Sequence, residues 1–413
     1  MAATTRVFSA SNAAKIEKLK RAAAAAQAFN PEDASEASGV AVSVSGTHDA
    51  NLSKAYSITT GTAAWRVLGG NPTLKADNTQ MVFPVASVSP NTNGNLSSIL
   101  TGTPDRQAWG WSIETQTSGD SMEFVAQGFT SFYFRIMVDG RYVAKTPVAY
   151  AVNNGVNYIK VDFSGVRAQR TIRFEASMQA GFLGLRVKPT ESCQRPYVSD
   201  GVIVFYAGDS YGEGQLIEAP GQPGALAFGN VAARLLGWDN PYQLSVGGTG
   251  WITAGAGRSK LYDQIALWPT LHPGVTPDVV VIATGYNDYS QTPSAVAVEV
   301  VNCLQRIRTL YPKAVVIVLG CWAGNRGPDA TTITMENTIL TAAVSVSDPL
   351  VFTVPVSTAS SPWQFGGGDT GAPTGTSIGD FELNPDKTHW NKAGHAAGGR
   401  RLANAVRGLF FAA

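Results

Sequence analysis

The sequence predicts an α/β domain with a parallel sheet over residues 200–413, preceded by an antiparallel β-sandwich over residues 40–190. Two observations predict this division. The first part consists of short alternating or aromatic-rich runs separated by Gly, Asn, Asp, Thr and Pro, with no helical pattern between them, which is typical of sandwiches. The second part alternates apolar runs with helical patterns, and this alternation builds a parallel sheet that helices cover on both faces.

Residues 1–39 are expected to be a helical or disordered extension of these domains. Residues 12–28 are rich in Ala, Lys, Glu, Leu and Arg, which favour a helix, and Pro31 ends the pattern. The segment has too few large apolar residues for us to expect firm packing against a core. It is therefore either a frayed, disordered segment or an anchor that attaches the protein to a larger assembly.

Several segments of the first domain are expected to be strands, because most of them alternate apolar and polar residues. They are residues 121–125, 132–138, 158–163, 171–176 and 182–187. Asp139-Gly140 joins the second of these to residues 141–144, which is a strong hairpin signal. These strands predict a sandwich.

The tryptophans of the sandwich allow two interpretations. Trp65, Trp109 and Trp111 either bind carbohydrate through exposed rings or fill the core, as aromatic residues in a sandwich usually do. Nothing in this domain assembles a nucleophile and a base, so we expect the chemistry elsewhere.

Strand and helix alternate in order through the second domain. The strands are expected at residues 202–207, 242–246, 278–284, 314–320 and 350–354, and the helices at residues 225–236, 259–267, 293–310, 330–345 and 392–410. Reactive groups in such sheets collect beyond the carboxyl ends of the strands. The first strand stops at Gly208, and Ser210 follows in a glycine-rich turn that lets another molecule approach the hydroxyl closely. Ser210 is therefore the candidate nucleophile.

A carboxylate and a histidine near the end of the chain supply the partners that this serine needs. Asp386 lies three residues before His389. A serine hydroxyl is a poor nucleophile until a base takes its proton, and the base needs a partner that fixes its tautomer and stabilises its cation. Ser210, His389 and Asp386 can fill these three roles.

Hydrogen-bond donors follow two further strands. Gly247-Gly248 comes after the second strand, and Asn287 comes after the third. Glycine N–H groups and an Asn amide can donate to the oxygen that becomes negative as the serine attacks an acyl group. Their order along the chain predicts a site for acyl transfer.

These four blocks resemble those of the SGNH (GDSL) hydrolases, a family of esterases and lipases. Gly208-Asp209-Ser210 matches the first block, Gly248 the second, Asn287 within residues 285–288 the third, and Asp386-Lys387-Thr388-His389 the last. The match spans residues 201–413, roughly half of the chain. It implies a flavodoxin-like three-layer α/β/α domain and a metal-independent serine esterase without a cofactor.

The resemblance also implies a role for each matched residue. Ser210 is the nucleophile, His389 the base and Asp386 its orienting acid. The oxyanion donors are the N–H groups of Ser210 and Gly248 and the side chain of Asn287. A jelly-roll-like sandwich before such a domain is similar to the two-domain carbohydrate esterases that remove acetyl groups from polysaccharides. The resemblance therefore predicts an acetylesterase that acts on an acylated carbohydrate or another small ester.

Two other interpretations of these residues fit the spacing less well. Residues 208–212 also fit the Gly-x-Ser-x-Gly elbow of α/β-hydrolases, but that fold places several strands before the elbow. A metal site built from Asp386, His389 and His395 would need a further ligand, and the sequence offers none. We expect neither a metal nor a cofactor.

Aromatic residues near the strand ends and the Asp-His block are candidates for binding a sugar ring. They are Trp251, Tyr286, Trp322, Trp363 and Trp390. The alternative that they fill the core beside the site stays open. Residues 357–379, dense in Gly, Ser, Thr and Pro, are a candidate rim of the site.

Composition limits the partners and the location. The formal net charge of +1 gives no reason to expect nucleic acid or an anionic membrane as a partner. No apolar run approaches the ~20 residues that cross a bilayer. The amino terminus lacks a recognisable secretory signal. These features predict a cytoplasmic or particle-associated protein, or one exported by a non-standard route.

Three functions remain open at this point. The first is a short-chain serine esterase that deacetylates a carbohydrate through an acyl-serine. The second is a lipase or thioesterase, which would need an apolar acyl channel. The third is a particle-associated carbohydrate-binding or adhesion protein with an esterase fold and residual chemistry, against which the full set of catalytic residues argues.

Overall fold

The computed structural model describes most of the chain. The described residues are 9–74, 81–82, 110–128, 133–151, 155–177, 180–197, 201–214, 226–255, 258–324, 327–363, 382–386 and 388–411. Trp109 and most of the expected rim at residues 357–379 lie outside these ranges.

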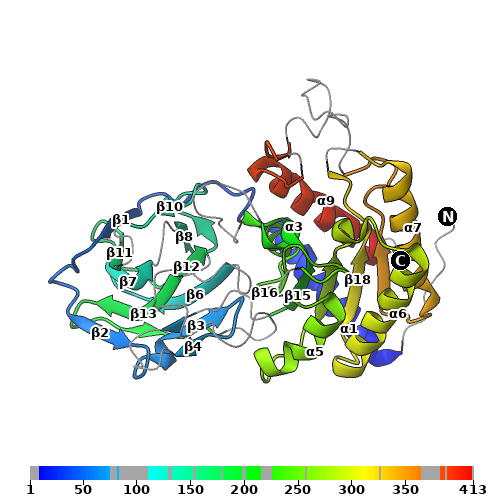
Figure 1. The fold of residues 1–413 in the computed structure, drawn as a ribbon. Helices are drawn as coiled ribbons and strands as arrows, with labels where there is room; N and C mark the ends of the chain where they lie inside the picture. Colours follow the sequence, from blue (N-terminus) through cyan, green and yellow to red (C-terminus); the bar gives the residue numbers. More distant parts are fainter. Residues whose placement is uncertain are drawn as a thin grey trace.

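A five-stranded sheet forms the centre of the second half of the chain (Figure 1). Its strands, in spatial order, are β16 Asn240–Gln243, β15 Ile203–Gly208, β17 Val279–Ala283, β18 Val315–Leu319 and β19 Val351–Val354. All neighbouring strands pair in parallel. Counted from β15, the order is that of a flavodoxin-like doubly wound sheet. The predicted α/β fold class is confirmed.

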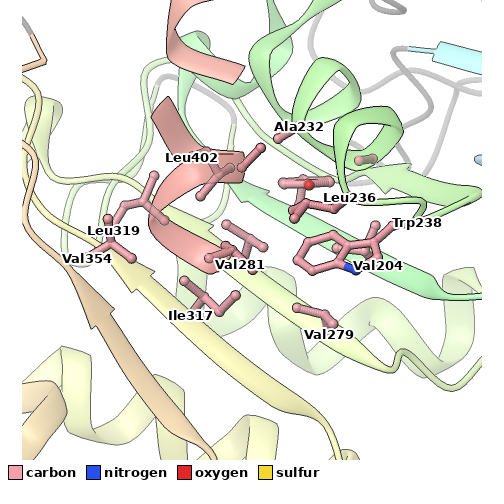
Figure 2. Close-up of a cluster of buried hydrophobic side chains, with 14 of the residues drawn as sticks. Val204, Ala232, Leu236, Trp238, Val279, Val281, Ile317, Leu319, Val354 and Leu402 are labelled. Carbon is pink, nitrogen blue, oxygen red and sulfur yellow. The ribbon is translucent and has the colours of Figure 1, made fainter. Parts of the chain in front are cut away.

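Helices cover both faces of this sheet because its strands are apolar on both sides. They are α3 Ser210–Glu213, α4 Phe228–Leu235, α5 Leu261–Leu271, α6 Pro293–Leu310, α7 Ala330–Ser345 and α9 Lys392–Phe411. Figure 2 shows Val204, Val281 and Ile317 on the face that Leu402 of α9 and Leu236 cover. The alternate residues of the same strands belong to a second core that includes side chains of α5, α6 and α7.

The first helix, α1 (Ala10–Ala28), packs against this domain. Ile16, Leu19 and Ala23 are buried in the core that α4 and α9 also line. Gly237 lies under the helix, and a Cβ there would meet the Ala22 carbonyl oxygen at 2.4 Å. The expectation that this segment packs loosely is therefore wrong, because small residues on both sides let the helix approach closely.

Two lysines also hold α1 in place. Lys15 and Lys18 both pair with the carboxylate of Asp278, which lies just before β17. The distance from Lys18 Nζ to Asp278 Oδ2 is 3.0 Å. Burial raises the pKa of Asp278, but the hydrogen bonds from Lys15, Ile203 and Lys18 outweigh it and hold the pKa below its usual range.

The first half of the chain forms two antiparallel sheets. One sheet has the strand order β1-β11-β7-β13-β5-β4, and β2 also pairs with β13. The other has the order β10-β8-β12-β6-β14, and in it β3 also pairs with β6 and β9 with β8. Their elements are β1 Ala41–Ser45, β2 Lys54–Ser57, the 3-10 turn Thr62–Ala64, β3 Trp65–Leu68, β4 Thr73–Leu74, β5 Met81–Val82, β6 Gly110–Thr117, β7 Ser121–Gly128, β8 Tyr133–Val138, β9 Arg141–Tyr142, β10 Val148–Ala149, β11 Val156–Asp162, β12 Arg170–Ser177, β13 Ala180–Val187 and β14 Cys193–Gln194. The predicted sandwich is confirmed.

The described tryptophans of the sandwich lie in its core. Trp65 and Trp111 are buried and pack with Phe182 and Phe174, respectively. Of the two interpretations of these residues, the structure supports core packing for both. The role of Trp109 stays a prediction.

Polar contacts join the two halves next to β16. Arg66 of β3 pairs with Asp239 at 3.4 Å, and the Gly69 N–H donates to the Asn240 side chain at 2.8 Å. The edge strand of the parallel sheet therefore lies against the sandwich, as Figure 1 also shows.

Within the described residues, no helix is both long and apolar enough to cross a membrane. The three cysteines are free and buried.

Candidate active site

The strand β15 delivers Ser210 to the carboxyl edge of the sheet. Gly208 ends the strand so close to β17 that a Cβ would meet the Ala283 carbonyl oxygen at 2.3 Å. The chain then turns into α3, which Asp209 caps by accepting the Tyr211 N–H at 3.1 Å. Ser210 opens this short helix, so its hydroxyl stands beyond the strand end.

His389 and Asp386 meet this serine in a hydrogen-bonded row. His389 Nε2 lies 2.8 Å from Ser210 Oγ, and His389 Nδ1 lies 2.5 Å from Asp386 Oδ2. The carboxylate therefore places the Nδ1 proton between His389 and itself, which leaves Nε2 free to accept from the serine. The structure brings together the three residues proposed from the sequence.

The Asp386 carboxylate is held by its own loop as well. Its Oδ1 accepts the N–H groups of Thr388 and His389, each at 3.1 Å. Burial raises the pKa of Asp386, but the hydrogen bonds from the His389 ring and these two N–H groups outweigh it, so the pKa lies below the usual range. Asp386 is therefore charged at neutral pH and suited to stabilise a histidinium.

Two tyrosines hold the loop that carries His389. The Tyr211 hydroxyl donates to the Thr388 carbonyl oxygen, and the Tyr286 hydroxyl lies 3.3 Å from Thr388 Oγ1. The Tyr211 ring is buried and stacks on Trp322 with centroids 5.3 Å apart. The sequence does not indicate this role of Tyr211, because a position directly after the nucleophile does not show which loop the hydroxyl reaches.

The loop after β16 carries the predicted glycine donor. Gly248 has φ +73°, a conformation that favours glycine. The neighbouring Gly247 N–H already donates to the Glu213 carboxylate. Of the two glycines, Gly248 therefore stays the candidate oxyanion donor, and nothing in the sequence points to the contact that Glu213 makes.

Asn287 and Asp288 fix this loop from the opposite side. Both lie in the 3-10 turn Tyr286–Asp288 that follows β17. Asn287 Nδ2 donates to the Thr249 carbonyl oxygen at 2.9 Å, which uses one of its two amide hydrogens. The Asp288 carboxylate accepts the N–H groups of Trp251 at 2.6 Å and Thr253 at 2.9 Å. No acceptor among the described residues takes the second amide hydrogen, so Asn287 stays a candidate oxyanion donor.

Asp209 is a buried acid directly beside the nucleophile. Burial raises its pKa to about 8, although the hydrogen bonds from the Tyr211 N–H and the Thr284 hydroxyl act in the opposite direction. Asp209 is therefore largely protonated at neutral pH. Its carboxyl group caps α3 by accepting the Tyr211 N–H.

His395 lies behind the site and is neutral. It is fully buried, and its Nδ1 accepts the Phe228 N–H at 3.2 Å. Burial, and to a smaller extent His389, lowers the pKa of His395 to about 3. Among the described residues, no cluster of three or more His, Cys, Asp or Glu side chains is arranged to hold a metal ion.

Most of the aromatic residues proposed to bind sugar belong to the core instead. Trp251 and Trp390 have no exposed surface, Trp322 is 1% exposed and Trp363 is 5% exposed. A ring packed on both faces cannot stack on a substrate, so the binding role predicted for these four residues is wrong. Tyr286 alone among the five is half-buried, and it remains a candidate contact.

A comparison with protein families matches residues 206–397 to the GDSL-like lipase/acylhydrolase family. This segment contains all of the blocks described above. No curated protein matches the chain in a sequence comparison.

Solved structures share the fold over both halves of the chain. A family two carbohydrate esterase from Cellvibrio japonicus has a TM-score of 0.60 at 14% identity, over 90% of this chain and 99% of that one. An acetyl xylan esterase from the rumen bacterium Butyrivibrio proteoclasticus has a TM-score of 0.57 at 12% identity, over 86% of this chain and 98% of that one. A salicylyl-acyltransferase from a tetracycline biosynthetic pathway has a TM-score of 0.58 at 16% identity, over 86% of this chain and 98% of that one. At these identities the likeness establishes the fold.

Proposed function

Because the chain carries a GDSL-like lipase/acylhydrolase domain in residues 206–397, we propose that it is a serine esterase that removes acetyl groups from a carbohydrate. The observation that carries the esterase proposal is the hydrogen-bonded row of Ser210, His389 and Asp386 at the carboxyl edge of the sheet. A base within hydrogen-bond reach of the nucleophile, and oriented by a carboxylate, is the arrangement that activates a serine.

In the first step of the proposed reaction, His389 Nε2 takes the Ser210 proton while Oγ attacks the ester carbonyl carbon. Asp386 stabilises the histidinium that forms. The negative charge on the carbonyl oxygen is met by the Ser210 N–H, the Gly248 N–H and the Asn287 amide. The tetrahedral intermediate collapses to an acyl-serine, and His389 returns its proton to the departing alcohol.

In the second step, water replaces the alcohol. His389 takes a proton from the water, which attacks the acyl-serine through the same oxyanion contacts. The acid leaves, and Ser210 regains its proton. This chemistry uses side chains and backbone N–H groups of the protein, and we propose that it needs no metal or cofactor.

The acyl group is proposed to be short because aromatic rings fill the space beside the nucleophile. Tyr211, Trp322 and Trp390 pack against one another there and are buried. The carbohydrate part of the proposal is supported by the shared two-part fold, since two of the structures reported above are described as carbohydrate or acetyl xylan esterases.

The test is hydrolysis of p-nitrophenyl acetate against p-nitrophenyl esters of longer acids, with Ser210→Ala as the control. Ser210-dependent turnover that falls with chain length would support the proposal, and acetate release from an acetylated polysaccharide would be measured next. A preference for long chains would indicate a lipase instead. No turnover of any ester would favour a binding protein on an esterase fold.

Assembly attachment through residues 1–39 remains a proposal of its own. The buried side of α1 is used within the protein, so an assembly would have to bind its exposed side. Deletion of these residues would remove part of the core, and it therefore cannot test attachment cleanly. Substitution of exposed residues such as Arg21 is the better probe, and unchanged association with the assembly would contradict attachment through α1.

A further inference from the structure

A cavity of about 460 Å³ lies where α1, the sandwich and α9 meet. It is lined by the end of α1 and the segment after it, by Arg141 at the start of β9, and by Arg400 and Arg407 of α9. Its volume lies within the ~300–1,000 Å³ that is common for ligand pockets. It shares no lining residue with the candidate active site.

The charges on its wall are mostly positive. Three arginines line the cavity together with one acid, Asp33. Arg400 pairs with Asp33 at 2.9 Å, and both side chains are more than half exposed to solvent. One positive charge is therefore compensated and two remain.

The other two guanidinium groups are held by neutral acceptors. Arg141 donates to Ser35 Oγ at 2.8 Å. Arg407 donates to the Leu235 carbonyl oxygen at 2.5 Å and to Asn404 Oδ1 at 3.3 Å. These contacts fix the positions of both groups without neutralising their charge.

Two arginines nearby follow a different pattern. Arg135 pairs with Glu175 at 2.8 Å, and Arg234 pairs with Glu32. An acid thus pairs with each of these buried arginines, whereas no acid among the described residues pairs with Arg141 or Arg407. Guanidinium groups held in place with unused donors are suited to bind carboxylate or phosphate oxygens.

The cavity also has an apolar wall. Phe29 is 40% exposed, and the Arg141 guanidinium lies 5.0 Å from its ring centroid. A ligand can therefore place an anionic group between the arginines and a ring or carbon skeleton against Phe29.

We propose that this cavity binds an oxyanion, either a carboxylate or a phosphate, carried by a small molecule such as an acidic sugar. Arg141 and Arg407 hold the oxyanion, and Phe29 contacts the carbon skeleton. The site lies apart from Ser210 and does not depend on its chemistry.

Isothermal titration of the full chain with galacturonate, inorganic phosphate and neutral galactose tests this proposal. At low salt at least one anion is expected to bind and galactose is not, and added salt is expected to weaken the binding. Galacturonate alone would identify a carboxylate ligand, and phosphate alone would identify a phosphate ligand. Binding of neither anion would overturn the proposal.

Variants locate the site. Arg141→Gln and Arg407→Gln are each expected to weaken binding at least tenfold, which is about 1.4 kcal/mol, because each removes a charge-assisted hydrogen bond to the anion. Arg21→Gln removes a charge from an exposed position of α1 outside the cavity and should bind as the wild type does. If both arginine variants bind as tightly as the wild type, the proposal is wrong.

Two controls keep this test independent of folding and of the esterase proposal. Arg407 also holds the end of α4, so circular dichroism should show that each variant is folded; if Arg407→Gln is not, the tenfold loss expected for Arg141→Gln carries the test. Ser210→Ala should bind the anion as the wild type does. Loss of esterase activity and loss of anion binding are thereby separable.

Discussion

Buried acids at the carboxyl edge of the parallel sheet and buried acids at its junction with the sandwich are stabilised in different ways. At the carboxyl edge, Asp288 and Asp209 accept backbone N–H groups. At the junction, Glu114 pairs with Arg66 at 2.8 Å and with Arg173 at 2.7 Å, and Glu175 pairs with Arg135. The protein thus uses acids beside the site to shape loops and acids at the junction to neutralise arginines.

This difference appears in the pKa values. Burial raises the pKa of Glu114 and Glu175, but the nearby arginines outweigh it and hold both below the usual range. Asp209 has no such cation, and burial raises its pKa to about 8. We therefore expect the junction acids to matter mainly for stability and Asp288 to matter mainly for the geometry of the site.

The largest effect is expected from breaking a junction pair. Arg135→Met leaves Glu175 buried without its closest cation, which should lower the free energy of unfolding by about 3–5 kcal/mol. Esterase activity per folded molecule should change little. Urea unfolding measures the free energy of unfolding, and an assay below the unfolding transition measures esterase activity. A large loss of activity without loss of stability would contradict a mainly stabilising role for the Arg135–Glu175 pair.

A carboxyl-edge acid should show the opposite pattern. Asp288→Asn replaces the carboxyl group that accepts the Trp251 and Thr253 N–H groups with an amide, so the loop that carries Gly248 should shift. Since loss of one oxyanion contact costs about 10²–10³ in kcat, we expect a loss of about 10²-fold. Steady-state kinetics on p-nitrophenyl acetate would measure it, and near-wild-type kcat would show that Asp288 does not position the loop.

The pH dependence of stability should reveal Asp209. Its pKa is near 3.9 in the unfolded chain and about 8 in the folded protein. The folded state therefore binds more protons between these values, and this contribution to stability is complete below about pH 4 and is lost as the pH rises through about 8. The slope is at most about 1.4 kcal/mol per pH unit.

Asp209→Asn should remove this contribution. Urea unfolding at several values between pH 5 and pH 8 would compare the two proteins. As the pH rises, the free energy of unfolding of the wild type should fall relative to that of Asp209→Asn. A difference that is constant across this range would mean that Asp209 does not titrate there.

The smallest effect is expected from a single hydroxyl. Tyr211→Phe keeps the buried ring but removes the hydrogen bond to the Thr388 carbonyl oxygen, and a loss of about 1 kcal/mol corresponds to a fall of roughly fivefold in kcat. Tyr262→Phe, whose hydroxyl contacts Arg306 on the far side of the domain, is the matched control. An equal effect of both changes would argue against a positioning role for Tyr211.

The strand ends and the catalytic blocks could be predicted because their signals are local. Five apolar runs, each followed by small or polar residues, define both the sheet and its carboxyl edge, and Asp386 and His389 lie within a single turn of the chain. The boundaries of the proposed domains at residues 39 and 190–200 remain predictions.

Other features depend on which loops meet in space. Nothing local indicates that Glu213 accepts the Gly247 N–H or that Tyr211 reaches Thr388. The same holds for α1, whose packing depends on Gly237 far along the chain. The sequence places Trp251, Trp322, Trp363 and Trp390 near the strand ends but does not show their burial, so it leaves open whether they bind a sugar or fill the core.

The most direct test of the central claim is reaction of the protein with a phosphonate ester that traps a serine nucleophile, followed by mass spectrometry of the digested chain. The esterase proposal predicts one adduct, on Ser210, that forms in step with the loss of ester hydrolysis and is absent from Ser210→Ala. An adduct on another residue, or hydrolysis that persists after Ser210 is fully modified, would contradict it.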